Sequence, residues 1–345
     1  MRLHGQQLRF GAVGLVLVAL VAGACTTGGG SSASPGGATS APSVAASSGG
    51  GTSAAPSAWG TVKLAVNPWT GSRANAAVIA HLLKEKLGYD VELKDLDEGI
   101  DWQGFETDEV DAILEVWGHD ADRKTFIDEK KVAQDAGTMG VKGSIGWYVP
   151  YWMGQKYPDI SDWNNLNKYA DLFKTSESGD KGQFLLGDPS YVSNDEALIK
   201  NLKLDYKVVA GGSEGTLIES LKQATIQETP LLAYFYDPQW AHSQTPFLEK
   251  PLVRINLPPS TPECATEGET VACDYPAYDL YKAVSAKFAA GGGRAYELIK
   301  NFSWSNLDQS TVSELIDNKG MTPEDAAKKW VDEHEDVWKA WLPAA

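Results

Sequence analysis

The chain has 345 residues and a formal net charge of −16 at pH 7. This length favours about two lobes of 100–180 residues over a single small domain. The acidic balance argues against a nucleic acid as a partner and leaves a cationic or zwitterionic small ligand open.

The N-terminal segment has the pattern of a targeting signal. Arg2 and Arg9 precede an apolar run that ends in small residues before Cys25, and the run is too short to span a membrane comfortably. Residues 20–25, Leu-Val-Ala-Gly-Ala-Cys, resemble the end of a bacterial lipoprotein signal. We predict that residues 1–24 are a signal peptide and that Cys25 is acylated. An ordinary secretory peptide cut near the same point is the alternative.

The segment after Cys25 is predicted to be a tether. Residues 26–58 contain no charge and no aromatic ring, a composition typical of flexible linkers. A random coil of this length spans roughly 30 Å. We therefore expect residues 25–58 to hold the folded part near the outer face of the bacterial cytoplasmic membrane, anchored there by lipid.

Strands and helices alternate in the first part of the folded sequence, which begins near Trp59. Strands are predicted at Thr61–Asn67, Tyr89–Leu93 and Val110–Trp117, and helices at Arg73–Leu87 and Asp101–Glu109. This alternation predicts a mainly parallel sheet that binds its ligand at the carboxyl ends of the strands. Trp69 and Trp117 both lie at such ends.

Two aromatic clusters divide the rest of the chain. Residues 146–153 hold four rings, and residues 234–240 repeat the pattern of aromatic residues before a proline. The segment between them has its own rhythm of strands and helices: Gln183–Gly187, Asn194–Leu202, Tyr206–Ala210, Thr216–Ala224 and Pro230–Tyr236. We predict an α/β clamp of the periplasmic-binding-protein type, with two crossover segments. Lobe 1 would comprise residues 59–143 plus 241–345, and lobe 2 residues 144–240, each a mainly parallel sheet flanked by helices.

The C-terminal part is predicted to begin with one more strand, Leu252–Leu257, and to continue as helices. These helices are expected at Tyr278–Ala289, Arg294–Asn301, Ser310–Asn318 and Pro323–Trp341. The last has several rings on one face, which we interpret as core: Trp330, His334, Trp338 and Trp341.

Cys264 and Cys273 form an even pair in a chain predicted to be exported, which indicates a disulfide. The loop that it closes would contribute about 2.5–3 kcal/mol to stability in the chain-entropy model. Two cysteines without a nearby histidine offer too few ligands for a metal site. We expect neither a metal nor a cofactor.

Aromatic residues at predicted strand ends favour one kind of ligand. The faces of Trp69, Trp117 and Tyr236 carry negative potential, and a cage of such faces holds a quaternary ammonium group, which cannot donate hydrogen bonds. Each ring would contribute about 0.5–2 kcal/mol. Three or four rings supply much of the ~8 kcal/mol that a micromolar affinity requires.

Several segments together resemble a known family. They are Asn67-Pro68-Trp69, Gly88-Tyr89-Asp90-Val91-Glu92-Leu93, the run from Val110 to Trp117, the Gly146–Pro150 stretch and the run from Tyr234 to Trp240. Over about residues 61–340 the chain resembles the substrate-binding proteins of glycine betaine, choline and proline-betaine ABC importers. The resemblance implies a clamp that holds the ligand's ammonium group in a Trp/Tyr cage. Such a protein delivers its cargo to a membrane permease that a separate ATPase powers.

By position, Trp69 and Trp117 match the cage tryptophans of that family. Tyr148, with Trp147 as its rival, matches the aromatic residue before Val-Pro, and strand alternation allows only one of these two faces to line the cleft. Tyr236 stands where many relatives have Trp. Gly71 stands where choline-preferring relatives often have Asp, which weakens the choline interpretation.

The other end of the ligand distinguishes the candidate substrates. A betaine carboxylate needs donors, which the helix start after Trp69 and the side chain of Arg73 could supply. The choline hydroxyl needs an acceptor, and Glu115 or Asp188 could serve. A solvated Arg73, a Glu115 paired with a cation and an Asp188 that only shapes a turn are the alternatives. We expect a betaine first and choline second, bound by a monomer without chemical turnover.

Two other functions compete with this interpretation. Residues 211–215 match the G-x-S-x-G pattern of serine hydrolases, and Asp237 and His242 follow Ser213 in the required order. Ser213 is equally suited to begin a helix. A carbohydrate-binding surface lipoprotein is the other alternative, because aromatic rings also stack on sugars, although few amides accompany the rings here.

Overall fold

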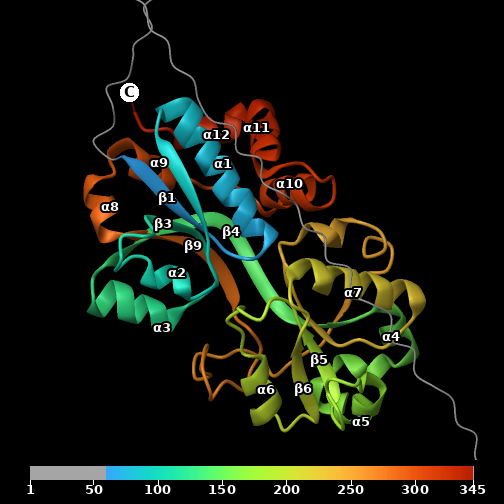
Figure 1. Cartoon of the computed structure of the whole chain (residues 1–345). Coiled ribbons are helices and arrows are strands. Elements are labelled where there is room, and N and C mark those ends of the chain that lie inside the picture. Colours follow the sequence, from blue (N-terminus) through green and yellow to red (C-terminus); the bar gives the residue numbers. More distant parts are fainter. Residues whose placement is uncertain (1–59, 345) are drawn as a thin grey trace, which may run out of the picture. The chain divides into compact units, whose positions relative to one another are not determined.

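The structure is a computed structural model that describes residues 60–344 (Figure 1). The predicted signal peptide, the acylated Cys25 and the tether lie outside the described residues and stay predictions. Within residues 60–344, no helix has both the length and the apolar character needed to cross a membrane.

The described strands form one mixed sheet in the order β2-β1-β3-β9-β4-β7-β5-β6, with β8 paired to β4. Their bounds are β1 (Thr61–Val66), β2 (Asp90–Asp95), β3 (Ala112–Val116), β4 (Ala133–Val149), β5 (Gly182–Leu186), β6 (Tyr206–Ala210), β7 (Ala233–Asp237), β8 (Val253–Arg254) and β9 (Ala277–Ser285). At one end β1 pairs in parallel with β2 and β3, and at the other β5 pairs in parallel with β6 and β7. The sheet thus contains the two predicted sets of parallel strands.

Helices flank the sheet. The α-helices are α1 (Thr70–Leu87), α2 (Ile100–Gln103), α3 (Asp120–Asp122), α4 (Tyr151–Lys156), α5 (Leu166–Tyr169), α6 (Asp195–Asn201), α7 (Glu214–Gln227), α8 (Ala286–Gly291), α9 (Gly293–Asn301), α10 (Asn306–Asp317), α11 (Pro323–Glu333) and α12 (Glu335–Trp338). A π-helix, η1 (Arg123–Glu129), and short 3₁₀ turns complete them: η2 (Pro158–Ser161), η3 (Trp163–Asn165), η4 (Ala170–Phe173), η5 (Trp240–Ser243) and η6 (Lys339–Trp341). The strands and helices predicted up to residue 237 occur in the predicted order, although the helix predicted at Asp101–Glu109 is only the short α2. Several elements between residues 118 and 173 were not predicted, among them most of the central strand β4.

The two parallel sets are joined by two antiparallel strands at the centre of the sheet. The 17-residue strand β4 pairs with β9 from Ala133 to Ser144 and then with β7 from Ser144 to Tyr148. Figure 1 shows β4 as the long green strand running from the β1 end toward the β5 end. One continuous strand therefore forms the first crossing. The Gly146–Met153 stretch splits between the end of β4 and α4.

Two predicted C-terminal elements are corrected. The segment Tyr278–Ala289, predicted as a helix, is the strand β9 followed by the short α8. β9 lies between β3 and β4 and is buried on both faces, so its apolar run lacks a strand's alternation and local pattern could not distinguish it from a helix. The predicted helix Pro323–Trp341 is interrupted at His334. Its rings Trp330, Trp338 and Trp341 are buried in the core, as predicted.

Two large cores and one small one hold the fold. One core packs α1 and α9 to α11 against β1 and β3, and includes Leu64, Ile79 and Trp330. Another surrounds β5 to β7 and the end of β4. This second core also contains residues from Ala241 to Tyr275, a segment that we expected to belong to lobe 1. The exact division into lobes stays a prediction.

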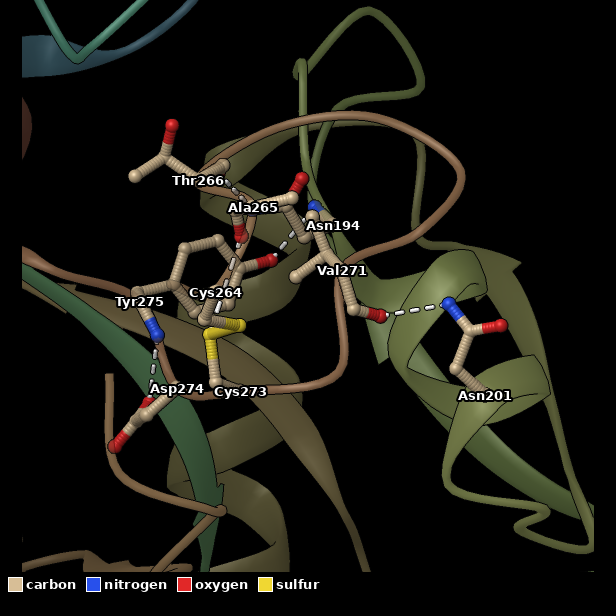
Figure 2. The surroundings of a disulfide bond; sticks show 9 residues. All are labelled: Asn194, Asn201, Cys264, Ala265, Thr266, Val271, Cys273, Asp274 and Tyr275. Carbon is tan, nitrogen blue, oxygen red and sulfur yellow. Dashed lines mark hydrogen bonds between the residues drawn. A yellow bond between two sulfur atoms is a disulfide. The ribbon is translucent and has the colours of Figure 1, made fainter. Parts of the chain in front are cut away.

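The disulfide between Cys264 and Cys273 is present (Figure 2). Its loop contacts segments that belong to the two parallel sets of strands. Glu267 accepts hydrogen bonds from the backbone N–H groups of Asp120 at 2.8 Å and Ala121 at 3.2 Å. On the other side, Asn201 donates to the carbonyl of Val271 at 2.8 Å. The closed loop therefore ties the segment after β3 to α6.

Candidate ligand-binding site

A small aromatic pocket is lined by residues from both parallel sets of strands and from β4 between them. Its lining residues are Trp69, Glu98, Trp117, Ile145, Tyr191, Val192, Tyr234 and Tyr236, and its empty volume of about 330 Å³ includes solvent at its mouth. Most of these residues stand at or just beyond the carboxyl ends of parallel strands, where α/β sheets bind ligands. Five of the eight are tryptophan or tyrosine.

The five rings contact one another edge to face or at a tilt. Trp69 and Tyr191 have ring centroids 6.0 Å apart, and Trp117 and Tyr236 have centroids 5.6 Å apart. Tyr234 connects them, with its ring 5.8 Å from Tyr191 and 6.2 Å from Tyr236. Edge-to-face packing fixes the orientation of the rings relative to one another.

Glu115 holds both tryptophans of the pocket. Its Oε1 accepts a hydrogen bond from the indole N–H of Trp69 at 2.9 Å and from that of Trp117 at 2.7 Å. Its Oε2 accepts from the amides of Asn75 and Gln309. Burial raises the pKa of Glu115 to about 7, although the four donors act in the opposite direction. Because both oxygens are engaged, Glu115 positions the two rings and is not free to accept from a ligand.

Gly143 of β4 makes room for Trp117. A Cβ atom at this position would stand only 2.4 Å from Cζ3 of the Trp117 ring. The ring therefore lies against bare backbone on one side and is held by Glu115 through its nitrogen.

The carboxylate of Glu98 supplies a negative charge to the pocket wall. Glu98 Oε1 lies 2.9 Å from Nε2 of His119, whose Nδ1 lies 2.8 Å from Asp122. Burial alone would lower the pKa of His119, but the hydrogen bonds and charges of Asp122 and Glu98 outweigh it and raise the pKa to about 10. Glu98 Oε2 accepts the backbone N–H of Val192 at 2.7 Å. This contact joins the loop after β2 to the loop after β5.

Tyr191 brings an unused polar group to the pocket. Its hydroxyl oxygen is buried and has no hydrogen-bond partner among the described residues. An unpaired buried hydroxyl costs free energy.

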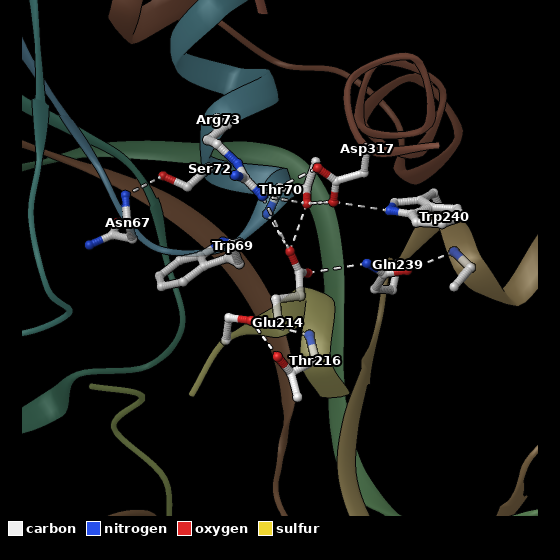
Figure 3. A network of polar contacts seen from close by, with 12 residues as sticks. Asn67, Trp69, Thr70, Ser72, Arg73, Glu214, Thr216, Gln239, Trp240 and Asp317 are labelled. Carbon is white, nitrogen blue, oxygen red and sulfur yellow. Dashed lines mark hydrogen bonds and ion pairs between the residues drawn. The ribbon is translucent and has the colours of Figure 1, made fainter. Parts of the chain in front are cut away.

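A second polar network lies next to Trp69 and centres on Glu214 (Figure 3). Glu214, at the start of α7, is 2% exposed and accepts the backbone N–H of Thr70 at 2.8 Å and its hydroxyl at 2.6 Å. It also accepts from the hydroxyl of Tyr236 and from the amide of Gln239 at 3.1 Å. Arg73 lies 3.7 Å from Glu214. This network joins the start of α1 to α7 and β7.

Comparison with known proteins decides the family. Residues 60–333 match the family described as the substrate binding domain of ABC-type glycine betaine transport system. The chain belongs to this family. Its members are substrate-binding components of ABC importers and not enzymes, so the protein is a solute-binding protein of the betaine and choline type.

Relatives of the family differ in the ligand that their names state. The chain is 26% identical, over 283 residues, to the trimethylamine N-oxide-binding protein of Pelagibacter ubique (strain HTCC1062), covering 78% of this chain and 87% of that one. It resembles the closed, liganded structure of lactococcal OpuAC with glycine betaine, with a TM-score of 0.64, 21% identity, and coverage of 82% of this chain and 100% of that one. It also resembles an ABC-transporter choline binding protein in complex with choline, with a TM-score of 0.66, 17% identity, and coverage of 81% and 91%. The structural likenesses establish the fold of a periplasmic binding protein.

The structure brings three of the ring residues expected from the family together. Trp69, Trp117 and Tyr236 line one pocket. The two rings predicted from the Gly146–Pro150 stretch lie elsewhere. Trp147 is fully buried in the second core, where its indole donates to Asp195 at 2.6 Å, and Tyr148 packs on Phe235. Strand β4 reaches the pocket at Ile145, two residues before Trp147, and contributes that side chain in place of the two predicted rings.

The polar residues expected to contact the ligand have other partners. Arg73 lies beside Glu214 and Asp317 and stands outside the aromatic pocket. Asp188 accepts from the backbone N–H of Ser190 at 2.9 Å and from its hydroxyl at 2.8 Å, which is the turn role given as its alternative. The sequence predicted the helix start that carries Arg73 and the turn that contains Asp188. It did not predict the side chains with which these two residues pair.

Five lining residues of the pocket were not among the predicted site residues: Glu98, Ile145, Tyr191, Val192 and Tyr234. Tyr234 belongs to the second aromatic cluster that the sequence highlights. Glu98 and Tyr191 follow the ends of the parallel strands β2 and β5. Position just beyond a parallel strand was thus the signal that could have found them.

The hydrolase pattern forms a helix start. The hydroxyl of Ser213 accepts the backbone N–H of Thr216 at 3.1 Å and caps α7. Nε2 of His242 lies 2.9 Å from the carbonyl of Tyr236. Ser213 therefore has the capping role that sequence reasoning gave as its alternative.

Proposed function

We propose that the protein captures a small methylated ammonium solute in the aromatic pocket and delivers it to the permease of an ABC importer. The candidates are glycine betaine, proline betaine and choline, joined by trimethylamine N-oxide because of the curated relative. The observation that carries the proposal is five Trp and Tyr rings around one small pocket whose charged lining residue is Glu98.

The chemistry of the lining favours a methylated cation. Ring faces and a carboxylate all attract positive charge, and each desolvated ring contributes about 0.5–2 kcal/mol to binding a quaternary ammonium group. Among the described residues, those that line the pocket include no lysine, no arginine and no side-chain amide. The lack of side-chain amides in this lining argues against the carbohydrate alternative, since sugar hydroxyls need acceptors and donors around the rings.

Closure around the ligand would bring the two sides of the pocket together. Trp69, Glu98 and Trp117 come from the segment before β4, and Tyr191 and Tyr236 from the segment after it. A ligand that touches both sets of rings stabilises the closed clamp, which is the usual way that two-lobed binding proteins sense their cargo. Anchoring through Cys25 and a monomeric state are part of this proposal.

Titration calorimetry of the purified protein tests the proposal. We expect binding of at least one of glycine betaine, proline betaine, carnitine, choline and trimethylamine N-oxide. In the variant Trp117→Ala the best ligand should bind about 1–3 kcal/mol more weakly, because one cage ring is lost. A folded sample that gives no heat with any of the five compounds would refute the proposed function.

A further inference from the structure

The place expected to receive a ligand carboxylate already holds a carboxylate of the protein. Glu214 Oε2 lies at the N-terminus of α1, where it accepts both the N–H and the hydroxyl of Thr70. Figure 3 shows Glu214 reaching from the end of α7 to this turn. The N-terminus of a helix favours an anion because its first N–H groups have no partner within the helix and its dipole is positive there.

Three other groups near this turn already face carboxylates of the protein. The hydroxyl of Tyr236 and the amide of Gln239 both donate to Glu214 Oε1. The guanidinium group of Arg73 lies 3.7 Å from Glu214 and 3.4 Å from Asp317. All of these groups would suit the carboxylate of a betaine, and all of them already face Glu214 or Asp317.

A ligand carboxylate would therefore meet an unfavourable wall. Tyr236 lines the pocket with its ring while its hydroxyl points to Glu214, so the network begins directly behind the pocket. Of the described residues that line the pocket, Glu98 is the charged one, and its two oxygens already pair with His119 and with the N–H of Val192, so it offers no donor to a ligand carboxylate. A buried carboxylate without cationic or N–H partners loses its hydration with little in return.

We propose that Glu214 takes the place of a ligand carboxylate and thereby sets the specificity of the pocket. The protein then selects methylated ammonium compounds that carry no carboxylate, such as choline and trimethylamine N-oxide, over the betaines. The hydroxyl or oxide of such a ligand pairs with the unused hydroxyl of Tyr191. This inference rests on the proposed function and narrows its ligand class.

The wild-type protein provides the first test. Titration calorimetry should give a dissociation constant for choline or trimethylamine N-oxide at least tenfold lower than that for glycine betaine, because burying a carboxylate without partners is costly. Glycine betaine binding as tightly as the better of the other two overturns the inference while leaving the proposed function intact. If none of the compounds binds to folded protein, the proposed function fails and the inference fails with it.

The variant Glu214→Ala provides the second test. Removing the carboxylate frees the N–H of Thr70, the hydroxyl of Tyr236 and the amide of Gln239 for a ligand carboxylate, so binding of glycine betaine should strengthen relative to trimethylamine N-oxide. Neither compound carries a net charge. The dissociation constant of glycine betaine divided by that of trimethylamine N-oxide therefore does not respond to a mere change in the charge of the protein. We expect this ratio to fall at least tenfold.

The matched control is Glu219→Ala, which removes the same charge from an exposed position of the same helix. Its ratio should equal that of the wild type. Glu214→Gln, which keeps the length of the side chain, replaces Glu214→Ala if thermal melting shows that the alanine variant is unfolded, and its ratio should fall in the same direction. An unchanged or higher ratio in a folded Glu214 variant overturns the inference.

Discussion

Gly143→Ala is a change outside the pocket lining that should weaken ligand binding. The backbone of Gly143 lies outside the left-handed region, so alanine brings no backbone strain. The new methyl group would stand 2.4 Å from Cζ3 of Trp117 and 2.9 Å from two further ring atoms. Carbon atoms normally approach to about 3.5–4.0 Å. The Trp117 ring must therefore move by more than about 1 Å.

A movement of this size affects each contact that positions the ring. It strains the 2.7 Å hydrogen bond to Glu115 and changes the edge contact with Tyr236 at 5.6 Å. Since one cage ring contributes about 1–2 kcal/mol to binding a cation, its displacement should weaken the best ligand roughly 5- to 30-fold. The overpacked strand should also lose about 1–3 kcal/mol of stability.

Titration calorimetry and thermal melting measure the two effects on one sample. The control is Gly60→Ala, because a methyl group there would meet no described atom within 4 Å. We expect wild-type affinity for this control. A folded Gly143→Ala protein with wild-type affinity would show that Trp117 does not contact the ligand through its present position, and the assignment of the pocket would have to be revised.

Three further predictions follow from the site and its surroundings. In Tyr191→Phe, the free energy of unfolding should equal or exceed that of the wild type, because the hydroxyl that is removed is buried and has no partner among the described residues. Ligand affinity should fall roughly 2- to 10-fold, the value of one hydrogen bond, and unchanged affinity in calorimetry would contradict a ligand contact. The pKa of His119 is raised from 6.5 to about 10 in the folded protein. The stability that the charged His119 contributes to the fold is therefore fully present below pH 6.5 and is lost as the pH rises through 10. Thermal melts of the wild type should therefore show a loss of stability on the order of 3–5 kcal/mol between pH 6.5 and 10, and the variant His119→Gln should lack this loss. If stability depends on pH in the same way in both proteins, the pairing of His119 with Glu98 and Asp122 is refuted. Reduction of the disulfide, or Cys264→Ser with Cys273→Ser, should lower the free energy of unfolding in urea by about 2.5–3 kcal/mol, and an unchanged midpoint would contradict this contribution.

The sequence by itself predicted the features that depend on local pattern. The strands and helices of the two parallel sets follow from apolar periodicity, from caps such as Ser213 and from stops such as Gly88. Most of the central strand β4 was not predicted. Trp69 and Trp117 could be assigned to the site because residues at the carboxyl ends of parallel strands gather at one edge of a sheet. The disulfide followed from the count of cysteines.

Tertiary structure alone decided which polar groups remain for a ligand. Glu115 looked like a ligand acceptor until the fold placed Trp69, Asn75 and Gln309 around it, from positions 46, 40 and 194 residues away. The start of α1 looked like an anion site until Glu214, 144 residues from Thr70, occupied it. A charged side chain shows its chemical type in the sequence, but whether it is free depends on partners that long-range packing supplies. The aromatic pocket was therefore predictable in outline, and its preference among ligands was not.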